Sequence, residues 1–298
     1  MLLFAGVLLC AALGCANKRK DLAAIRDTYA AGKYEETVLL CDRTLRGGVE
    51  DGEVYYFCGM SLLALGRDPE AHDRFERALR ADSALSGGIT GHLIDKAEDA
   101  RARGAIGRAA RLARTAAEFD GEAPVGSLKY LVAGSYFEDK DWKAAARWYA
   151  EAIAEYPDTD AAESAYFNLA ACLSAVGDSS SAIEALEKQL LEYPRGTLAS
   201  RAGWTLANLL YDKARSDFIR GDYETAVRGA RRVIDTARHT VMIQKAGFLL
   251  GESYERMGDF DSAYEQYRAI AGEDDNAPGG IAERARAKIR ALRDAGLR

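Results

Sequence analysis

A short motif recurs along this 298-residue chain and constrains its fold more than any other feature. The motif has the approximate form Gly-x-aromatic-x-x-Ala and stands between two stretches of helical character. Its first position recurs every 34 to 44 residues, at Gly32, Gly66, Gly104, Lys140, Gly177, Gly221 and Gly258. A period of this length is typical of helical-repeat arrays in which each repeat is a hairpin of two helices. We therefore expect about seven stacked hairpins.

The composition favours an all-α fold. The chain has 5 prolines, and 48% of its residues are apolar, so it can bury a substantial core. Ala, Leu, Glu and Arg are abundant and favour helix over strand. The formal net charge is −6, and Arg and Glu are interspersed rather than gathered in blocks, which disfavours nucleic acid as a partner.

The repeats resemble the tetratricopeptide repeat (TPR) family, whose helical hairpins carry small and large residues at fixed positions. In the last repeat Gly251 stands at a small position and Tyr267 at a large one, and in the second repeat Gly59 and Phe75 do the same. Small residues let the two helices touch, and large residues fill the space between them. The resemblance implies a TPR-type α-solenoid, a right-handed superhelix of about seven hairpins with a C-terminal capping helix.

The repeats are expected over residues 21–278. The first has Thr37 where the family has Ala, and the third has Gly104 and Ala109 but no aromatic residue. Over residues 279–298, Ala, Ile and Leu alternate with Arg and Glu, which predicts a polar-faced helix that caps the array.

The N-terminus predicts export. Residues 1–14 form an uncharged, apolar segment that is too short for a mature membrane span and is typical of a signal peptide. It ends in Ala-Leu-Gly-Cys and resembles the lipobox of bacterial lipoproteins. The resemblance implies that Cys15 is acylated and that residues 15–20 form a short basic tether. An ordinary signal peptide or a short membrane anchor is the alternative.

Two nearly duplicate links around Tyr156-Pro157 and Tyr193-Pro194 end successive repeats. Such links resemble those of TPR lipoproteins in outer-membrane β-barrel assembly and in periplasmic cell-wall coordination. The resemblance implies a place in the bacterial envelope, with a lipid anchor in the outer membrane and the body facing the periplasm. Ala16 in place of Asp resembles an outer-membrane sorting signal.

The sequence offers no support for catalysis. His72, His92 and His239 lie far apart, and none has a partner at metal-ligand spacing. No nucleotide-binding or nucleophile motif follows a plausible strand. We therefore expect a protein that is not an enzyme, with no catalytic residue, no metal and no cofactor.

Cys41 and Cys58 stand at interior positions of adjacent repeats. A disulfide between them would suit an oxidising compartment. The favoured interpretation is that both are small buried hydrophobes, because free Cys packs well in cores and Cys172 makes the number odd.

The first helix of each hairpin lines the concave face in the TPR family, and this chain places aromatic residues there. Aromatic anchors dominate interface energetics, so these rings are predicted to bind an extended peptide or a partner's helix. The alternative is that each ring packs against the neighbouring first helix. The predicted partner-binding residues are Tyr56, Tyr130, Phe137, Phe167, Tyr211, Phe218 and Phe248.

These observations predict a lipid-anchored scaffold that binds protein partners in envelope assembly. Charged residues near the predicted groove are mixed in sign, which argues against a dedicated clamp for a carboxylate terminus. Two alternatives remain open. One is an accessory subunit of a periplasmic transport system, which predicts an enclosed, partly apolar pocket for a small ligand or a surface that docks a solute-binding protein. The other is a helper in secretin or pilus assembly.

Overall fold

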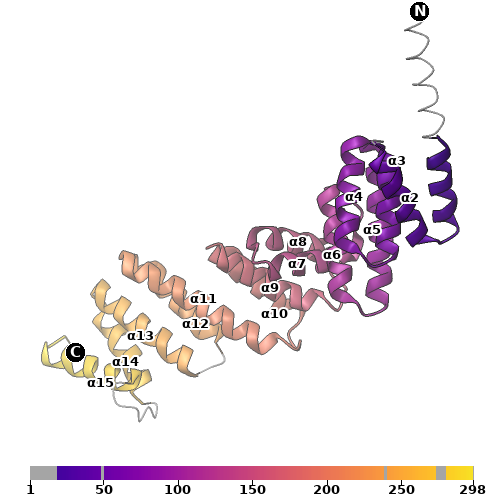
Figure 1. The fold of residues 1–298 in the computed structure, drawn as a ribbon. Helices are drawn as coiled ribbons and strands as arrows, with labels where there is room; N and C mark the ends of the chain where they lie inside the picture. The colour runs from indigo at the N-terminus through magenta and orange to yellow at the C-terminus, as the bar shows by residue number, and fades with distance from the viewer. Residues whose placement is uncertain (1–18, 48–49, 238–239, 273–279, 298) are drawn as a thin grey trace, which may run out of the picture. The chain divides into compact units, whose positions relative to one another are not determined.

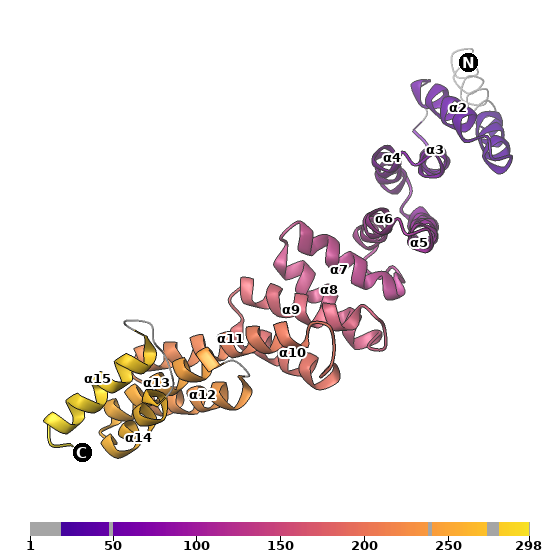
Figure 2. The ribbon, with the colours of Figure 1, turned by 90° about the horizontal axis from the view of Figure 1, so that it is seen from below.

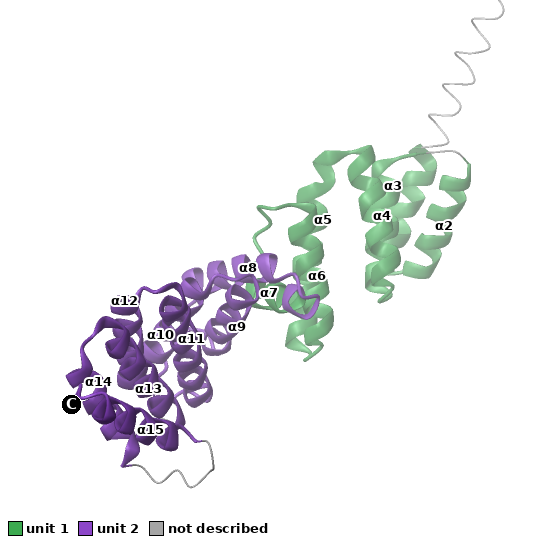
Figure 3. Ribbon diagram, turned by 90° about the vertical axis from the view of Figure 1, so that its left-hand side faces the viewer, with its two compact units in different colours: residues 1–135 green, residues 136–298 purple. Residues whose placement is uncertain are grey.

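The computed structural model describes residues 19–47, 50–237, 240–272 and 280–297, and within them the protein is helical without a β-strand. The predicted all-α fold is confirmed (Figure 1). The chain divides into two compact units, residues 1–135 (unit 1) and 136–298 (unit 2), which Figure 3 shows in separate colours.

Unit 1 is built from helical hairpins. It begins with a helix over residues 19–30. Among the helices that follow, α3 (Gly52–Ala64) pairs with α4 (Asp68–Ala81), and α5 (Ser86–Ala102) pairs with α6 (Ile106–Phe119). Figure 2 shows these two pairs nearly end-on. The elements are α2 (Tyr34–Arg46), α3 (Gly52–Ala64), α4 (Asp68–Ala81), η1 (Ser83–Leu85), α5 (Ser86–Ala102), α6 (Ile106–Phe119), η2 (Gly126–Leu128) and α7 (Lys129–Glu138), which runs past the unit boundary.

Unit 2 continues the pattern, and each helix from α8 onward packs on the next in chain order. The first helices of two successive hairpins also meet, because α11 contacts α13, and α13 in turn contacts the C-terminal helix α15. Hairpins stacked in chain order are the arrangement of a TPR-type α-solenoid, as predicted. The helices are α8 (Trp142–Glu155), α9 (Ala162–Ala175), α10 (Ser179–Glu192), α11 (Ala199–Arg220), α12 (Tyr223–Thr236), α13 (Thr240–Met257), α14 (Phe260–Ala271) and α15 (Ile281–Asp294).

All seven turn positions adopt a left-handed backbone, with φ between 61° and 86°. This conformation lets the amide after the turn bond back to the first helix, as Asp222 N donates to Asp217 O at 3.0 Å. Glycine adopts it without steric cost, and six of the seven positions are Gly. Lys140, with φ of 61°, is the exception.

The two units differ in how the second helix of each hairpin begins. In unit 2 an Asp follows every turn, and its side chain accepts a hydrogen bond from the amide three residues on, at 3.0 to 3.1 Å. In unit 1 the same place holds Lys33, Arg67 and Ala105, which make no side-chain cap. Side-chain caps satisfy helix-end amides, so the hairpins of unit 2 carry a stabilising contact that those of unit 1 lack.

Two repeats depart from the expected small residues, with different consequences. Thr37 is fully buried, but its hydroxyl donates to the carbonyl of Lys33 at 2.9 Å. Gln189 stands where the preceding repeat has Ala152, and it is also fully buried. Neither its amide nitrogen nor its amide oxygen has a hydrogen-bond partner within the described residues. A buried amide without a partner is costly, so Gln189 is a weak point in the core of unit 2.

The two Tyr-Pro links are joined to each other. The Tyr193 hydroxyl donates to the carbonyl of Pro157 at 3.0 Å. The Glu163 carboxylate accepts from the amides of Thr197 and Leu198, at 3.2 and 2.7 Å. These bonds fix the spacing between α9 and α11, the first helices of neighbouring hairpins.

The expected signal peptide, the expected acylation site Cys15 and the first part of the expected tether lie outside the described residues. Where the structure describes the chain, no helix combines the length and apolar character needed to cross a bilayer.

Candidate partner-binding face

The first helices of unit 2 carry the aromatic residues that the sequence places in the groove. Phe167 lies on α9, Tyr211 and Phe218 on α11, and all three rings are partly exposed. Phe248 on α13 is buried, with 5% of its surface exposed. Phe137 is partly exposed and packs edge-on against Trp142, with ring centroids 5.3 Å apart.

Three of these rings are each covered by an arginine. The guanidinium carbon of Arg201 lies 4.7 Å from the ring centroid of Phe167. Arg256 covers Phe218 at 5.9 Å. These distances are within the range of cation–π contacts, in which the face of the ring attracts the positive charge.

Arg284 covers Phe248 at 4.3 Å and completes the series. Each arginine lies two helices further along the chain than its ring, so the contacts run from α11 to α9, from α13 to α11 and from the C-terminal helix α15 to α13. We call this surface, defined by Phe167, Phe218, Phe248 and their arginines, the arginine–aromatic face.

Tyr211 lies on α11, between Arg201 and Phe218 along the helix. Burial raises the pKa of Tyr211, the nearby Arg215 opposes this rise, and the nearby Glu252 adds to it. The phenol therefore stays neutral at physiological pH and can both donate and accept a hydrogen bond.

The face carries more positive than negative charge. Arg201, Arg215, Arg256 and Arg284 are all exposed, and none of the four forms an ion pair within the described part of the chain. The acidic groups near Tyr211 are Asp212 and Glu252. The sequence indicated charges of mixed sign near the groove, and the structure adds Arg201 and Arg284 to the positive side.

The predicted residues of unit 1 lie differently. Tyr56 is partly exposed, and its ring meets Phe57 at 5.2 Å and His92 at 6.4 Å. Tyr130 is 7% exposed and belongs to the core of unit 1. Tyr130 and Phe248 therefore contribute mainly to the packed core. The sequence left open this alternative, in which a ring packs against neighbouring helices instead of facing a partner.

The pairing of arginines with the rings was missed by sequence reasoning, although a signal for it exists. Each arginine follows its aromatic partner by 34 to 38 residues, which is one repeat period. An arginine one period after a first-helix aromatic residue would have identified all three pairs.

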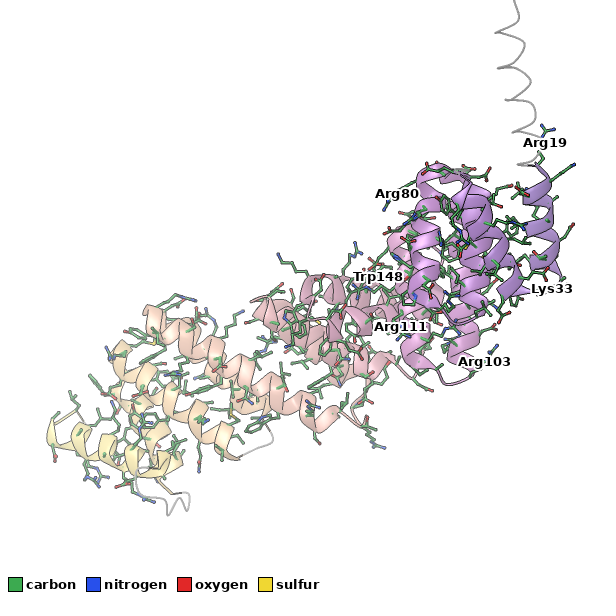
Figure 4. The ribbon with its side chains drawn as sticks, in the orientation of Figure 1. Arg19, Lys33, Arg80, Arg103, Arg111 and Trp148 are labelled. Carbon is green, nitrogen blue, oxygen red and sulfur yellow. The ribbon has the colours of Figure 1, made fainter. Side chains whose placement is uncertain are left out.

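The hollows in the described part of the protein test whether it could bind a small ligand, as the transport alternative predicts. In unit 1 a hollow of about 180 Å³ lies between α4 and α6, with Leu63, Leu93 and Leu112 among its walls. Arg111 on α6, which Figure 4 labels, also lines it. Ligand pockets usually measure about 300 to 1,000 Å³. A hollow of about 560 Å³ between α8 and α10 is larger but more open. Neither is the enclosed pocket that the transport alternative predicts.

Among the described residues, no three His, Cys, Asp or Glu side chains gather in a way that could hold a metal ion.

Comparison with known proteins supports the repeat type. Residues 245–277, which cover most of α13 and α14, match the tetratricopeptide repeat family model. Helical repeats of this kind generally serve as scaffolds that bind proteins rather than as enzymes. No curated protein matches the chain in sequence.

Several solved structures show a distant likeness. The first is Naa15/Naa10 bound to HypK-THB, with 14% identity over 93% of this chain, 39% of that chain and a TM-score of 0.41. The C-terminal part of a TPR repeat-containing protein from Cytophaga hutchinsonii has 11% identity over 90% of this chain, 99% of its own and a TM-score of 0.38. Pseudomonas aeruginosa PilF has 15% identity, 82% and 97% coverage, and a TM-score of 0.30.

The chain thus spans about two fifths of the first of these structures, 39% of its length. All three TM-scores lie below 0.5, so these likenesses say nothing about the partners of this protein.

Proposed function

We propose that this protein is a lipid-anchored scaffold of the bacterial envelope that holds a protein partner against the arginine–aromatic face of unit 2. The observation that carries the proposal is the series of three arginines that lie over rings of successive first helices. A stacked guanidinium keeps its N–H edge free to donate two parallel hydrogen bonds to a carboxylate. Because the four arginines lack ion pairs within the described residues, their complement is an acidic segment of the partner.

The test of this face is the loss of partner binding after neutral substitutions. We expect Arg201→Gln, Arg256→Gln and Arg284→Gln each to weaken binding by about tenfold, and the triple variant more, because each removes a charge-assisted contact. Binding should also weaken as salt is raised. The partner is first identified by placing a photocrosslinking residue at Asn208, which is partly exposed one turn before Tyr211.

Arg147→Gln is the matched control, because Arg147 also lies over a ring, that of Trp148 at 5.4 Å, but on the second helix α8. If Arg147→Gln weakens binding as much as the three face variants, or if none of the three has an effect, the face is not the binding surface.

The anchor and the compartment form the second part of the proposal. They are supported by the apolar run of residues 1–14 and by Cys15 at its end. Acylation would confine the scaffold to the membrane surface and raise its local concentration near a membrane partner. Metabolic labelling with a fatty acid should mark the wild-type chain and not Cys15→Ser. Membrane fractionation should then place the wild type with the outer membrane.

The identity of the crosslinked partner separates the remaining candidates. A subunit of outer-membrane protein assembly supports the proposal as stated. A secretin or pilus subunit would instead select the pilus-assembly alternative, in which the same face serves another pathway. A solute-binding protein would select the transport alternative, although the hollow of about 180 Å³ does not favour a bound small ligand.

A further inference from the structure

Two cysteines of unit 1 meet in the core. Cys41 lies on α2 and Cys58 on α3, and both side chains are fully buried. The two thiols interact with each other, because each shifts the pKa of the other. Because α2 closes the first hairpin and α3 opens the second, the two cysteines lie on helices of neighbouring hairpins that pack together.

The pair lies beside an arginine. Arg74 on α4 forms an ion pair with Asp42 at 2.9 Å, and both charges act on the two thiols. The interaction with Cys41, supported by Arg74, lowers the pKa of Cys58, whereas the interaction with Cys58 and burial raise the pKa of Cys41. Of the two, Cys58 therefore loses its proton more readily, and the thiolate is the form that attacks a disulfide.

Cys172 provides a contrast within the same chain. It lies on α9 in unit 2, and burial raises its pKa to about 11. It is also the only other cysteine in the described part of the chain. A thiol of this kind is unreactive, which makes Cys172 the internal control for the pair.

We propose that Cys41 and Cys58 are a site of covalent modification, at which an intramolecular disulfide joins the first hairpin to the second. The oxidant is a low-molecular-weight or protein disulfide. The Cys58 thiolate attacks this disulfide, forms a mixed disulfide and releases one thiol. Cys41 then loses its proton and attacks the sulfur of Cys58, which releases the second thiol. Two electrons pass to the oxidant, and one S–S bond is exchanged for another.

Burial decides when this reaction occurs. Neither thiol is exposed in the folded chain, so exchange takes place while the chain folds or when α2 opens from α3. When the hairpins close again, α2 packs on α3 and brings Cys41 and Cys58 together.

The disulfide would stabilise a weakly held part of the protein. Lys33, before α2, makes no side-chain cap. A link between residues 17 apart closes a short loop and lowers the entropy of the opened state. Opening of α2 from α3 should become rarer by about a hundredfold.

The test is oxidative refolding of the full chain. The reduced protein is refolded from urea with a mixture of glutathione and glutathione disulfide, blocked with N-ethylmaleimide, digested and mapped by mass spectrometry. We expect a Cys41–Cys58 linked peptide as the main cross-link in the wild type and in Cys172→Ala. In Cys41→Ala and Cys58→Ala the partner cysteine should carry glutathione or N-ethylmaleimide.

A second measurement does not depend on the variants. Amide hydrogen exchange over Tyr34–Arg46 should be about a hundredfold slower in the oxidised wild type than in the reduced wild type, whereas exchange in α9 should not change. The proposal is overturned if Cys41 and Cys58 both still react with N-ethylmaleimide after oxidation. It is also overturned if disulfides from Cys41 or Cys58 to a third cysteine are as frequent as the Cys41–Cys58 disulfide. Either result leaves partner binding by unit 2 untouched.

Discussion

The ring of Tyr267 lies so close to Gly251 that a Cβ added to Gly251 would come within 2.6 Å of a ring carbon. The second hairpin repeats this relationship, because a Cβ on Gly59 would come within 2.6 Å of the Phe75 ring. Both rings are fully buried. In these two hairpins the helices approach until backbone and ring touch, which requires the absence of a side chain.

Gly251→Ala should therefore destabilise the protein by about 1 to 3 kcal/mol, because the new methyl group overpacks the core of α13 and α14. Urea unfolding followed by the circular dichroism of the full chain measures the loss. The double variant Gly251→Ala with Tyr267→Leu should recover part of it, since the smaller side chain makes room.

Gly203→Ala is the matched control. Gly203 lies inside α11, and a Cβ there would have no heavy atom within 4 Å. This change should stabilise the helix by up to about 1 kcal/mol, because Ala favours helix over Gly. Equal effects of the two substitutions would mean that the close approach at Gly251 is not a constraint.

At Lys140 a substitution is expected to stabilise the protein. Its left-handed backbone, with φ of 61°, costs an L-residue roughly 1 to 2 kcal/mol, and the other six turns avoid this cost with Gly. Lys140→Gly should raise the free energy of unfolding by about 1 kcal/mol. Gly177→Ala, at a turn with φ of 86°, should lower it by a similar amount. A stabilising Gly177→Ala would contradict the argument.

The buried amide of Gln189 gives a third prediction. Since neither polar atom has a partner within the described residues, Gln189→Met should stabilise unit 2 by about 1 to 3 kcal/mol, with little change in volume. The contrasting variant is Thr37→Val, which removes a hydroxyl that already has an acceptor and should not stabilise. The midpoints of thermal unfolding of the two variants, compared with that of the wild type, test this prediction. A destabilised Gln189→Met would indicate a bound water or another partner at this amide.

The sequence was sufficient to predict the hairpins. The turn residues and the Gly251–Tyr267 and Gly59–Phe75 pairs are local to one repeat, so their spacing alone locates them. The third repeat, around Gly104, lacks an aromatic residue and still forms the hairpin of α5 and α6. The fully buried Ala109 shows that close helix packing there depends on small residues rather than on a ring.

The candidate face was only partly predictable. Its rings were found because their positions on the first helices follow the repeat, but exposure depends on what the next hairpin places above each ring. Phe248 is buried in contact with Arg284 from α15, whereas Phe167 beneath Arg201 stays partly exposed. Such contacts join residues a whole repeat apart, and their geometry follows only from the stacking of the helices.

The aspartates that follow the turns of unit 2 predict a difference in acid sensitivity. Hydrogen bonds from the backbone of Ser181 hold the pKa of Asp178 below its usual range, and hydrogen bonds from Thr225 do the same for the pKa of Asp222. A lowered native pKa means that the unfolded chain binds the proton more readily. The stabilisation is complete above the unfolded pKa of about 3.9 and is lost as the pH falls through the lower native value.

Amide exchange measured between pH 5 and pH 3 should therefore show α10 and α12 losing protection as the pH falls, more than α2 and α6, which begin after Lys33 and Ala105. The variant Asp222→Asn distinguishes the effect of the capping hydrogen bond from the effect of the negative charge, because Asn still accepts the hydrogen bond but does not titrate. In this variant the loss of protection at the start of α12 should become much less dependent on pH, while α10 should behave as in the wild type. An α12 whose acid response is unchanged by Asp222→Asn would show that other carboxylates govern the acid stability of unit 2.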